Sequence, residues 1–422
     1  KETMRFSRVI PPDWPPRERH DTVKRNRDHA MPSRRKDARP PRRSAPRPPQ
    51  KGRAPPRGAP APTAASAGPP LPPRVKAPPT PALLLPAQPG RWLWTCRAGF
   101  EAHLFEELAW AGVSPRMLGE VLVESERRPT EPPIFARTGI RVLASLPTAR
   151  SLSESAEVLT ARILAALPSG ALVLQSFTPD SPAGNRLADD ADALLEAVRT
   201  RLPAERLLEE TWRAREAAAT LVELCVAPGG IVVGEVPAQE ALSLSPGGRQ
   251  RMRRPTDSPS RAAMKLEEAL VNLPYEPGRG EVCVDLGAAP GGWTQRLVAR
   301  GARVIAVDPA KLMPELTQQP RVEHVQESAF AYTPEEPVDW LCCDMAWRPL
   351  EVAQLLAKWG RRGWATHLVA NIKLPMKDKN PLLRRVRHIL TEDGGWQGLT
   401  MRQLYHDRDE VTVTAHHRGL GP

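Results

Sequence analysis

The stretch "EVCVDLGAAPGGWTQRLVARG", residues 281–301, decides the fold class. It begins with a short apolar run typical of a buried strand and ends in a pattern that predicts a helix, and a glycine-rich turn joins the two. Gly287, Gly291 and Gly292 remove side chains where a ligand must approach the backbone. Pro290 stiffens the same turn. The turn has neither the G-x-G-x-x-G spacing of a dinucleotide-binding loop nor the Gly-Lys-Ser/Thr ending of a Walker A loop.

The next predicted strand, "RVIAVDP" at residues 303–309, contains an acidic residue near its end, Asp308. A carboxylate in this place can accept hydrogen bonds from both ribose hydroxyls of an adenosine moiety. Because the turn lacks a pyrophosphate fingerprint, Asp308 indicates S-adenosylmethionine as the cofactor. Two plainer interpretations stay open: a tight turn that binds no ligand, and Asp308 as a helix cap.

The segments after Ser260 alternate between strand and helix patterns. Further strands are predicted at 321–328, 338–345, 366–374, 399–406 and 410–417, and helices at 350–360 and 381–390. This alternation predicts an α/β fold with a doubly wound, Rossmann-like parallel sheet that binds its ligands at the carboxyl ends of the strands. Only a turn separates the last two strands, which predicts an antiparallel hairpin at one edge.

Residues 91–250 are predicted to form two small α+β modules, divided near residue 150. In the first, "RWLWTCRAG" predicts a strand and "FEAHLFEELAWAG" an amphipathic helix, and from Ser151 elements of the same kinds repeat. Neither module contains an obvious catalytic cluster. We therefore expect the chemistry to lie in residues 251–422.

Residues 1–90 differ in composition from the rest of the 422-residue chain. They hold 23 of the 49 prolines and have 20 Lys and Arg against 6 Asp and Glu, a net charge of +14, whereas the remainder has a net charge of −2. Proline removes hydrogen-bond donors and the arginines repel one another, so we expect a disordered, partly polyproline II tail. Such a tail either keeps the protein soluble or contacts nucleic acid non-specifically. The rest of the chain must bind any polyanion through a local patch.

The five cysteines show no C-x-x-C spacing and lie mostly in apolar runs. This pattern favours reduced, buried thiols in a cytoplasmic protein over a disulfide framework or a zinc site. No segment approaches the length and hydropathy of a membrane span, and we recognise neither a signal peptide nor a transit peptide. We expect no membrane partner.

The segment "VANIKLPMK", residues 369–377, places Lys373 near the end of a predicted buried strand. A lysine is seldom desolvated unless it is paired or used. Asp344 ends the apolar run "DWLCCDM" in the same way, so two neighbouring strands carry opposite charges at their carboxyl ends. Lys265 on the predicted helix before the first strand and Glu410 at the start of the final strand could join them.

The helix that carries Lys265 lies in "DSPSRAAMKLEEAL". Serine hydroxyls accept hydrogen bonds from the first backbone N–H groups of a helix. Ser258 or Ser260 is therefore predicted to cap this helix.

The four charged residues suit methyl transfer from a sulfonium to an oxygen nucleophile. A ribose hydroxyl is a poor nucleophile until its proton is removed. Low dielectric and a second ammonium would lower the pKa of Lys373, which opposing carboxylates would raise again, so that part of the amine is neutral and can act as a base. We predict Lys373 as the base, Asp344 as its orienting group beside the cofactor, Lys265 as an electrostatic tuner and Glu410 as a support. Each residue also has a structural alternative. Lys373 and Asp344 could form a plain ion pair, Lys265 could be an exposed helix lysine, and Glu410 could be a solvated charge at the end of a strand.

These motifs together resemble a known family. "DLGAAPGGWTQRL", "CCDM", "NIKLPMK" and "RQLYHDRDEVTV" resemble the FtsJ-like ribose 2′-O-methyltransferases, which use a Lys-Asp-Lys-Glu tetrad. With "SPSRAAMKLEEA", "CRAGFEAHLFEEL" and "IFAR", residues 91–418 are similar to the RlmM type, bacterial enzymes that methylate the ribose of a cytidine in 23S rRNA.

The resemblance implies a function, a domain organisation and site residues. Lys373 would accept the proton, and S-adenosylmethionine would bind beside Gly287, Ala289, Pro290, Gly291, Gly292, Asp308 and Asp344. A tail at 1–90 would precede an N-terminal ferredoxin-like module at 91–150, a THUMP-like RNA-binding module at 151–250 and the methyltransferase domain at 251–422. The partner would be 23S rRNA before the subunit is fully assembled, and the enzyme would be a cytoplasmic monomer that needs no metal.

Three features depart from the family pattern. Ala289 stands where the family often has a cysteine, and Ser328 stands where members tend to have an acidic residue that meets the adenine. Ser328 would then make a weaker adenine contact. The tail at 1–90 lies outside the family.

For two further signals, packing or solvation is an alternative to function. Cys342 and Cys343 could suggest a nucleophile, but burial in a strand is favoured. The helix at 381–390, with Lys377 and Lys379 nearby, offers either phosphate contacts or a solvated face.

The remaining aromatic and histidine signals favour packing over ligand binding. Trp293 is predicted to pack in the core, and His416 and His417 lack partners at metal-ligand spacing. Two alternative functions stay open: 2′-O-methylation of another RNA such as tRNA, and a non-catalytic RNA-binding or ribosome-assembly factor.

Overall fold

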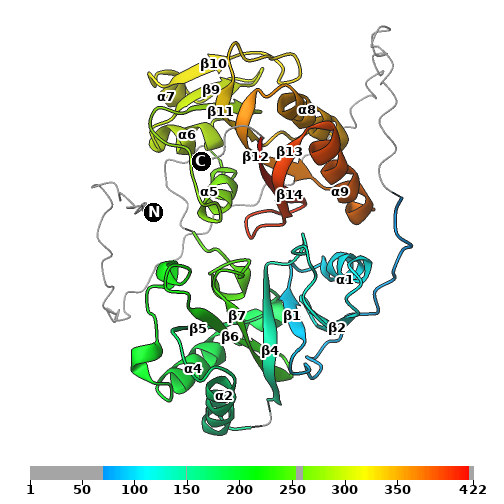
Figure 1. Ribbon diagram of the computed structural model, residues 1–422, viewed down its shortest axis with the longest axis vertical. Coiled ribbons are helices and arrows are strands. Elements are labelled where there is room, and N and C mark those ends of the chain that lie inside the picture. The colour runs from blue at the N-terminus through cyan, green and yellow to red at the C-terminus, as the bar shows by residue number, and fades with distance from the viewer. Residues whose placement is uncertain (1–69, 149, 253–259, 418–422) are drawn as a thin grey trace, which may run out of the picture. The chain divides into compact units, whose positions relative to one another are not determined.

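The computed structural model describes residues 70–148, 150–252 and 260–417. Within them the strands form two seven-stranded sheets (Figure 1). The first sheet has the order β2-β3-β1-β4-β7-β6-β5. Its strands are β1 (Trp92–Thr95), β2 (Pro115–Gly119), β3 (Leu122–Ser125), β4 (Thr138–Pro147), β5 (Leu172–Phe177), β6 (Thr220–Ala227) and β7 (Gly230–Pro237), and its helices are α1 (Glu101–Trp110), α2 (Leu152–Ala166), α3 (Pro182–Asn185) and α4 (Ala188–Arg199).

This sheet crosses the module boundary that the sequence predicts near residue 150. Strand β4 precedes the boundary and pairs antiparallel with β7, which follows it, from Arg141 opposite Glu235 to Pro147 opposite Gly230. The two sets of elements thus share one hydrogen-bonded ladder. The assignment of separate ferredoxin-like and THUMP-like modules stays a prediction.

The end of the predicted tail is ordered, contrary to the expectation of disorder up to residue 90. Leu84 is only 9% exposed, and its N–H donates to the Pro228 carbonyl at 2.7 Å. The N–H of Leu85 donates to the Leu118 carbonyl at 2.8 Å. The burial of Leu84 and these two backbone hydrogen bonds offset the conformational entropy lost when the segment is ordered. The proline-rich composition alone does not reveal these contacts. Residues 1–69 lie outside the described part of the chain.

The second sheet has the order β10-β9-β8-β11-β12-β14-β13. Its strands are β8 (Val282–Leu286), β9 (Arg303–Val307), β10 (Val322–Val325), β11 (Val338–Cys343), β12 (Ala365–Lys373), β13 (Trp396–Arg402) and β14 (Glu410–His417), and its helices are α5 (Ala263–Val271), α6 (Gly292–Ala299), α7 (Pro314–Thr317), α8 (Pro349–Arg361) and α9 (Lys379–His388). The first five of these strands pair in parallel, and β14 pairs antiparallel with both β12 and β13. The predicted Rossmann-like sheet with an antiparallel hairpin at one edge is confirmed.

The chain leaves β8 toward β9 on one side and returns to β11 on the other. This reversal of direction creates the crevice in which doubly wound sheets bind ligands. The crevice lies at the carboxyl ends of β8 and β11, the strands followed by the glycine-rich turn and by Asp344.

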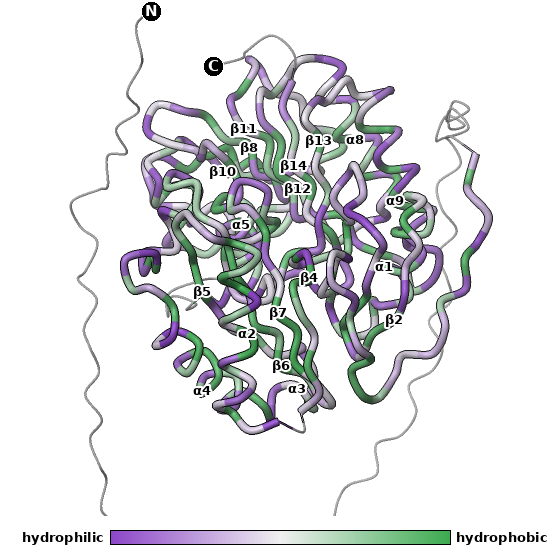
Figure 2. The backbone as a smooth tube through the Cα atoms, turned by 60° about the horizontal axis from the view of Figure 1, so that its bottom comes forward, coloured by the Kyte–Doolittle hydropathy of each residue, from purple (hydrophilic) through white to green (hydrophobic). Residues whose placement is uncertain are grey.

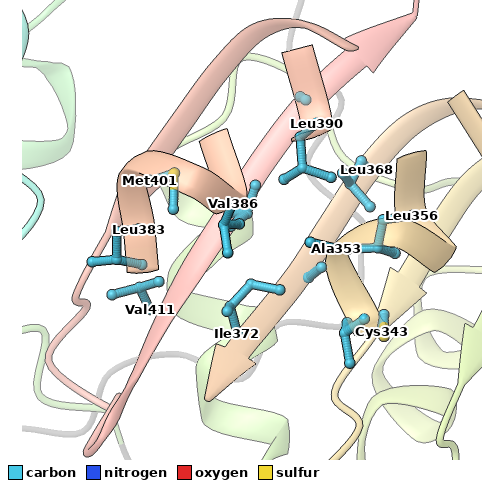
Figure 3. Packing of buried hydrophobic residues seen from close by; sticks show 14 of the residues in the cluster. Cys343, Ala353, Leu356, Leu368, Ile372, Leu383, Val386, Leu390, Met401 and Val411 are labelled. Atoms are coloured by element: carbon cyan, nitrogen blue, oxygen red, sulfur yellow. The ribbon is translucent and has the colours of Figure 1, made fainter. Parts of the chain in front are cut away.

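Alternate residues of the central strands pack on opposite faces of the sheet. In β11, Trp340 and Cys342 belong to the core that includes residues of α5 and α6, whereas Leu341 and Cys343 belong to the core with α8 and α9. Figure 3 shows Cys343 and Ile372 close to the apolar side chains of those two helices. The prediction that both cysteines are buried is therefore confirmed.

The hydropathy of the chain differs between the central strands and the surface helices. Figure 2 shows hydrophobic colour concentrated in strands such as β6 and β7, whereas α4 alternates between hydrophilic and hydrophobic positions. In α4 the buried positions are Ala191, Leu194 and Val198, which recur at the spacing of one helix face. Within the described residues, we find no helix whose length and apolar character would let it cross a membrane.

Helix α5 begins later than the predicted serine cap requires. Its N-cap is Ala262, whose side chain offers no hydrogen-bonding group. The hydroxyl of Ser260 instead accepts from the N–H of Ala262 at 3.2 Å, a local turn that precedes the helix. Ser260 thus accepts from the N–H two residues further on, as a capping serine does, although the N-cap of α5 is Ala262. Ser258 lies outside the described residues.

Candidate active site

Four charged side chains from separate elements converge at the carboxyl end of the second sheet. Lys373 Nζ lies 3.1 Å from Asp344 Oδ1 and also donates to Glu410 Oε2. Lys265 Nζ lies 3.3 Å from Asp344 Oδ2 and 2.6 Å from Glu410 Oε1. Each carboxylate thus contacts both ammonium groups. We call Lys265, Asp344, Lys373 and Glu410 the charged ring.

The local structure explains how these residues meet. Lys373 is the last residue of β12 and lies directly opposite Glu410, the first residue of β14, in the antiparallel ladder. Asp344 follows β11, which is the parallel neighbour of β12 on its other side. Lys265 reaches the ring from α5.

The charged ring is largely removed from solvent. The side chains of Lys265, Asp344 and Glu410 are 13%, 12% and 7% exposed, while that of Lys373 is 30% exposed. Burying such charges is costly unless each one is paired and hydrogen-bonded. Two positive and two negative groups in mutual contact meet that condition, and Lys373 is the member most open to a substrate.

The pKa of Lys373 corrects one sequence-based expectation. Burial acts to lower this pKa, but the negative charges of Asp344 and Glu410 outweigh burial and raise it above the ordinary lysine value. Burial likewise acts to raise the pKa of Glu410, and its contacts with Lys265 and Lys373 lower it overall. The direction of this shift favours the ammonium form of Lys373 over the expected partly neutral amine. The second lysine does not offset two carboxylates in direct contact.

Asn371 supports the ring and was missed in the sequence. Its Nδ2 donates to Asp344 Oδ1 at 3.2 Å, and its Oδ1 accepts from the Thr412 hydroxyl at 2.9 Å. Asn371 is fully buried and lies two residues before Lys373, so both side chains leave the same face of β12. A polar residue at that spacing inside an apolar strand was the available signal.

A cavity of about 150 Å³ lies beside the glycine-rich turn, and we call it the loop cavity. It is lined by Ser260, Ala262, Asp285, Gly287, Ala288, Ala289, Pro290, Gly292, Trp293 and Asp344. Of the described residues predicted to contact the cofactor, Gly291, Asp308 and Ser328 do not line this cavity. Asp344 belongs to both the cavity and the charged ring, so the two adjoin.

Close packing explains the glycines of the turn. Gly287 has a φ of +78°, and a Cβ there would lie 2.7 Å from Met345 Cγ. Gly291 has a φ of +116°, and a Cβ would lie 2.0 Å from Leu316 Cδ1. Positive φ and these short distances both disfavour any larger residue. Gly291 therefore shapes the turn from outside the cavity.

Asp308 faces the glycine-rich turn. Its Oδ2 accepts from the N–H of Ala289 at 3.1 Å and its Oδ1 from the N–H of Ala310 at 2.8 Å. A carboxylate oxygen can accept two hydrogen bonds, so acceptor capacity is left for a ligand. Asp308 caps no helix, since the next one, α7, begins at Pro314 with Met313 as its N-cap, so the helix-cap alternative is wrong. The predicted contact with ribose stays a prediction.

Asp285 is a second residue that the site prediction left out. It is 1% exposed, and its Oδ2 accepts from the Thr294 hydroxyl at 2.7 Å. Burial, aided by the nearby charge of Asp344, raises the pKa of Asp285 to about 7. Two carboxylates at one small cavity suit a cationic ligand, and S-adenosylmethionine carries both an ammonium and a sulfonium. The residues present therefore fit the cationic groups of that cofactor.

Two arginines of α9, the helix predicted either to contact phosphate or to present a solvated face, line a cavity separate from the charged ring. Arg384 and Arg387 of α9 line a cavity of about 500 Å³ together with residues of α1, and the Arg384 guanidinium lies 5.7 Å from the Trp110 ring centre. None of the four residues of the charged ring lines this cavity. Lys379 is buried and donates to the Pro375 carbonyl at 2.7 Å, so it serves the local backbone. Phosphate contacts by the arginines stay a prediction.

Two smaller predictions concern packing and metals. Trp293 is 3% exposed and belongs to the core, as predicted, and it also lines the loop cavity. The described residues contain no group of three or more His, Cys, Asp or Glu side chains placed to hold a metal ion.

Comparisons with known proteins identify the family. Residues 259–358 match the family described as FtsJ-like methyltransferase. The ribosomal RNA large subunit methyltransferase M of Xylella fastidiosa (strain M12) is 34% identical over 355 residues, which cover 76% of this chain and 97% of that protein. The protein of the same name from Alkalilimnicola ehrlichii is 37% identical over 355 residues, covering 77% of this chain and 94% of that protein.

A solved structure of Aeropyrum pernix fibrillarin with bound S-adenosyl-L-methionine covers 46% of this chain at 18% identity, with a TM-score of 0.29, too low to support any inference. The identity and coverage of the full-length relatives are decisive instead. The chain belongs to the ribosomal RNA large subunit methyltransferase M family.

Proposed function

We propose that this protein transfers a methyl group from S-adenosylmethionine to the ribose 2′-hydroxyl of a cytidine in 23S rRNA, with Lys373 as the proton acceptor. The observation that carries the proposal is the closed charged ring beside the acidic loop cavity, in a chain of this family. A proton-handling group next to a site for a cationic donor is what methylation of a hydroxyl requires.

The residues of the loop cavity would hold the cofactor. When bound, S-adenosylmethionine would supply the methyl group as an electrophile. Asp285 and Asp344 provide negative charge for its cationic groups, and Gly287 and Gly292 allow close approach to the backbone. Asp308 retains acceptor capacity for ribose hydroxyls. Ser328 as a weaker adenine contact belongs to the same proposal.

Lys373 must lose its proton before it can act as a base. Burial already acts to lower its pKa, and 30% of its side chain is still exposed. An RNA that covers the ring would remove this exposure and strengthen the effect that favours the neutral amine. Asp344 and Glu410 meanwhile hold the nitrogen in one direction, and Lys265 balances their charge.

The remaining parts of the chain would position the RNA. Residues 91–150 and 151–250 would act as RNA-positioning modules, the second of them THUMP-like, and the basic residues at 1–90 would add non-specific contacts. We further propose that the protein acts as a cytoplasmic monomer on rRNA that is not yet fully assembled into a subunit, without a metal.

The proposal is tested by measuring methyl incorporation into unmodified 23S rRNA. We expect Lys373→Ala to lower the rate about a hundredfold or more, with cofactor binding retained. Lys358→Ala is the matched control. Lys358 lies on α8, with its Nζ 5.1 Å from the centre of the Trp364 side-chain ring. It neither lines the loop cavity nor belongs to the charged ring.

Each rival predicts a different result. Equal incorporation by wild type and Lys373→Ala would remove Lys373 as the base. Cofactor binding without incorporation into any RNA would favour the non-catalytic factor. Incorporation into tRNA but not 23S rRNA would favour the other substrate, and mapping the modified nucleotide would identify it.

A further inference from the structure

A second cavity, of about 620 Å³, adjoins the charged ring on the side of Lys265 and Glu410, and we call it the ring cavity. Tyr405 and His406 line it from the loop between β13 and β14. Arg97 and Asp180 line it from the part of the chain that carries the first sheet. Its volume is in the range of sites that enclose a small ligand. A nucleotide held here would contact residues of both sheet regions.

One buried arginine connects Asp180 with Tyr405. Arg137 is 1% exposed, and its Nη1 donates to Asp180 Oδ2 at 2.6 Å. The same guanidinium lies 5.1 Å from the ring centre of Tyr405. Asp180 is also 3.8 Å from the Arg249 guanidinium and has a side chain that is 30% exposed. The carboxylate is therefore fixed in direction and still accessible.

The helix of the charged ring also fixes Tyr405. Glu268 of α5 is 3% exposed, and its carboxylate oxygens accept from the N–H of Tyr405 at 2.8 Å and the N–H of His406 at 2.9 Å. Lys265 lies three residues before Glu268, on the same side of this helix. The position of the aromatic ring is thus tied to the position of a ring lysine.

We propose that the ring cavity receives the base of the nucleotide being methylated, that the base stacks on Tyr405, and that Asp180 accepts a hydrogen bond from the 4-amino group of cytosine. This inference rests on the proposed function. Unpaired bases in RNA are commonly stacked on aromatic side chains and read at their Watson–Crick edges. Asp180 is then a specificity-determining residue supplied from outside the methyltransferase domain.

The chemistry of the carboxylate explains the selectivity. An ionised carboxylate only accepts hydrogen bonds, and each of its oxygens can accept two, so the bond from Arg137 leaves room for another donor. Cytosine presents an amino group at its 4-position, a suitable partner for aspartate. Uracil presents a carbonyl oxygen at the same place, which a carboxylate repels. Asp180 therefore favours cytidine over uridine.

The test compares two substrates. The nucleotide that the wild-type protein methylates in unmodified 23S rRNA is mapped first. Two RNAs are then prepared that carry either cytidine or uridine at that position. We expect Asp180→Asn to lower the cytidine-to-uridine ratio of kcat/KM about tenfold, because an amide can both accept and donate. Cofactor affinity should be unchanged, and Asp190→Asn, at an exposed position of α4, should keep the wild-type ratio.

Several outcomes overturn the inference. An unchanged ratio in Asp180→Asn, with methyl transfer preserved, refutes the role of Asp180 and leaves the proposed function intact. A methylated nucleotide that is not a cytidine refutes it as well. Failure of the wild type to methylate any RNA is a failure of the proposed function itself.

A measurement on the wild-type protein covers the case in which Asp180→Asn does not fold. The target nucleotide is replaced by one with a pyrimidin-2-one base, which lacks the 4-amino group. We expect kcat/KM to fall about tenfold with this RNA. Equal rates with the two bases refute the hydrogen bond to Asp180.

Discussion

Lys373 and Glu410 lie directly opposite each other in the β12–β14 ladder, and their side chains form a hydrogen bond at the edge of the ring cavity. The backbone register of two strands therefore sets the distance between the proposed base and one of its carboxylate partners. This arrangement makes the protonation of Lys373 depend on Glu410.

Glu410→Gln should move the pH dependence of methyl transfer to lower pH. The substitution keeps the shape of the side chain but removes one of the two negative charges that raise the pKa of Lys373. More of the amine is then neutral at a given pH, so the rising limb of the rate begins earlier. Single-turnover rates at saturating cofactor measure the shift. Glu410 does not line the loop cavity, so we expect the substitution to leave cofactor binding unchanged.

The outcome separates a base from a structural ion pair. A limb that stays in place, or moves to higher pH, would contradict Lys373 as the titrating group. Glu267→Gln is a matched control, since Glu267 lies on α5 but pairs with Arg300 rather than with the ring.

Asn371→Ala should lower the stability of the methyltransferase domain. Asp344 would lose one donor inside the protein, and the Thr412 hydroxyl would keep only Asp407 Oδ2 as an acceptor. We expect the free energy of unfolding to fall by about 1–3 kcal/mol. Urea unfolding of the protein without ligands measures it. Asn185→Ala, at an exposed position, should cost far less, and an equal cost for the two variants would contradict the supporting role of Asn371.

Gly287→Ala should weaken cofactor binding more than a glycine substitution with the same backbone strain. Gly287 and Gly395 have φ values of +78° and +73°, but a Cβ at Gly287 would meet Met345, whereas a Cβ at Gly395 would meet no described atom within 4 Å. We expect the Kd for S-adenosylmethionine to rise about tenfold or more in Gly287→Ala. Calorimetry compares it with Gly395→Ala, and similar affinities would show that close packing at the turn is unimportant.

The sequence was sufficient for those features that depend on local pattern. The glycine-rich turn and the alternation of strands and helices predicted the second sheet, and charges at the ends of apolar strands singled out Lys373 and Asp344. For Lys265 and Glu410 the sequence offered only the possibility that they lie nearby. Lys373 and Asp344 could be found because a charge in an apolar strand is costly and therefore conspicuous.

Features that depend on contacts distant in sequence could not be predicted in the same way. The raised pKa of Lys373 follows from distances to Asp344 and Glu410 that no spacing reveals. The packing of Leu84 requires the carbonyl of Pro228. Asp180 reaches the ring cavity only because the chain folds the two sheet regions against the same loop.

Asp285 should make cofactor binding stronger as pH rises. Its pKa is raised to about 7, so it is largely protonated at pH 6 and largely ionised at pH 8. A cationic ligand in the loop cavity favours the ionised form, which means that affinity increases as the proton leaves. If only the ionised form binds, the Kd for S-adenosylmethionine falls about tenfold between pH 6 and pH 8.

Asp285→Asn should remove this dependence, because the amide stays neutral throughout that range. Titrations by calorimetry at pH 6, 7 and 8 should therefore give nearly constant, weak binding for the variant. Asp344 also lines the cavity and is unchanged in this variant, so any pH dependence left in Asp285→Asn would report on groups other than Asp285. The same steep dependence in both proteins would refute the assignment of Asp285, whereas a flat response in the variant alone would identify it as the carboxylate that senses the cation.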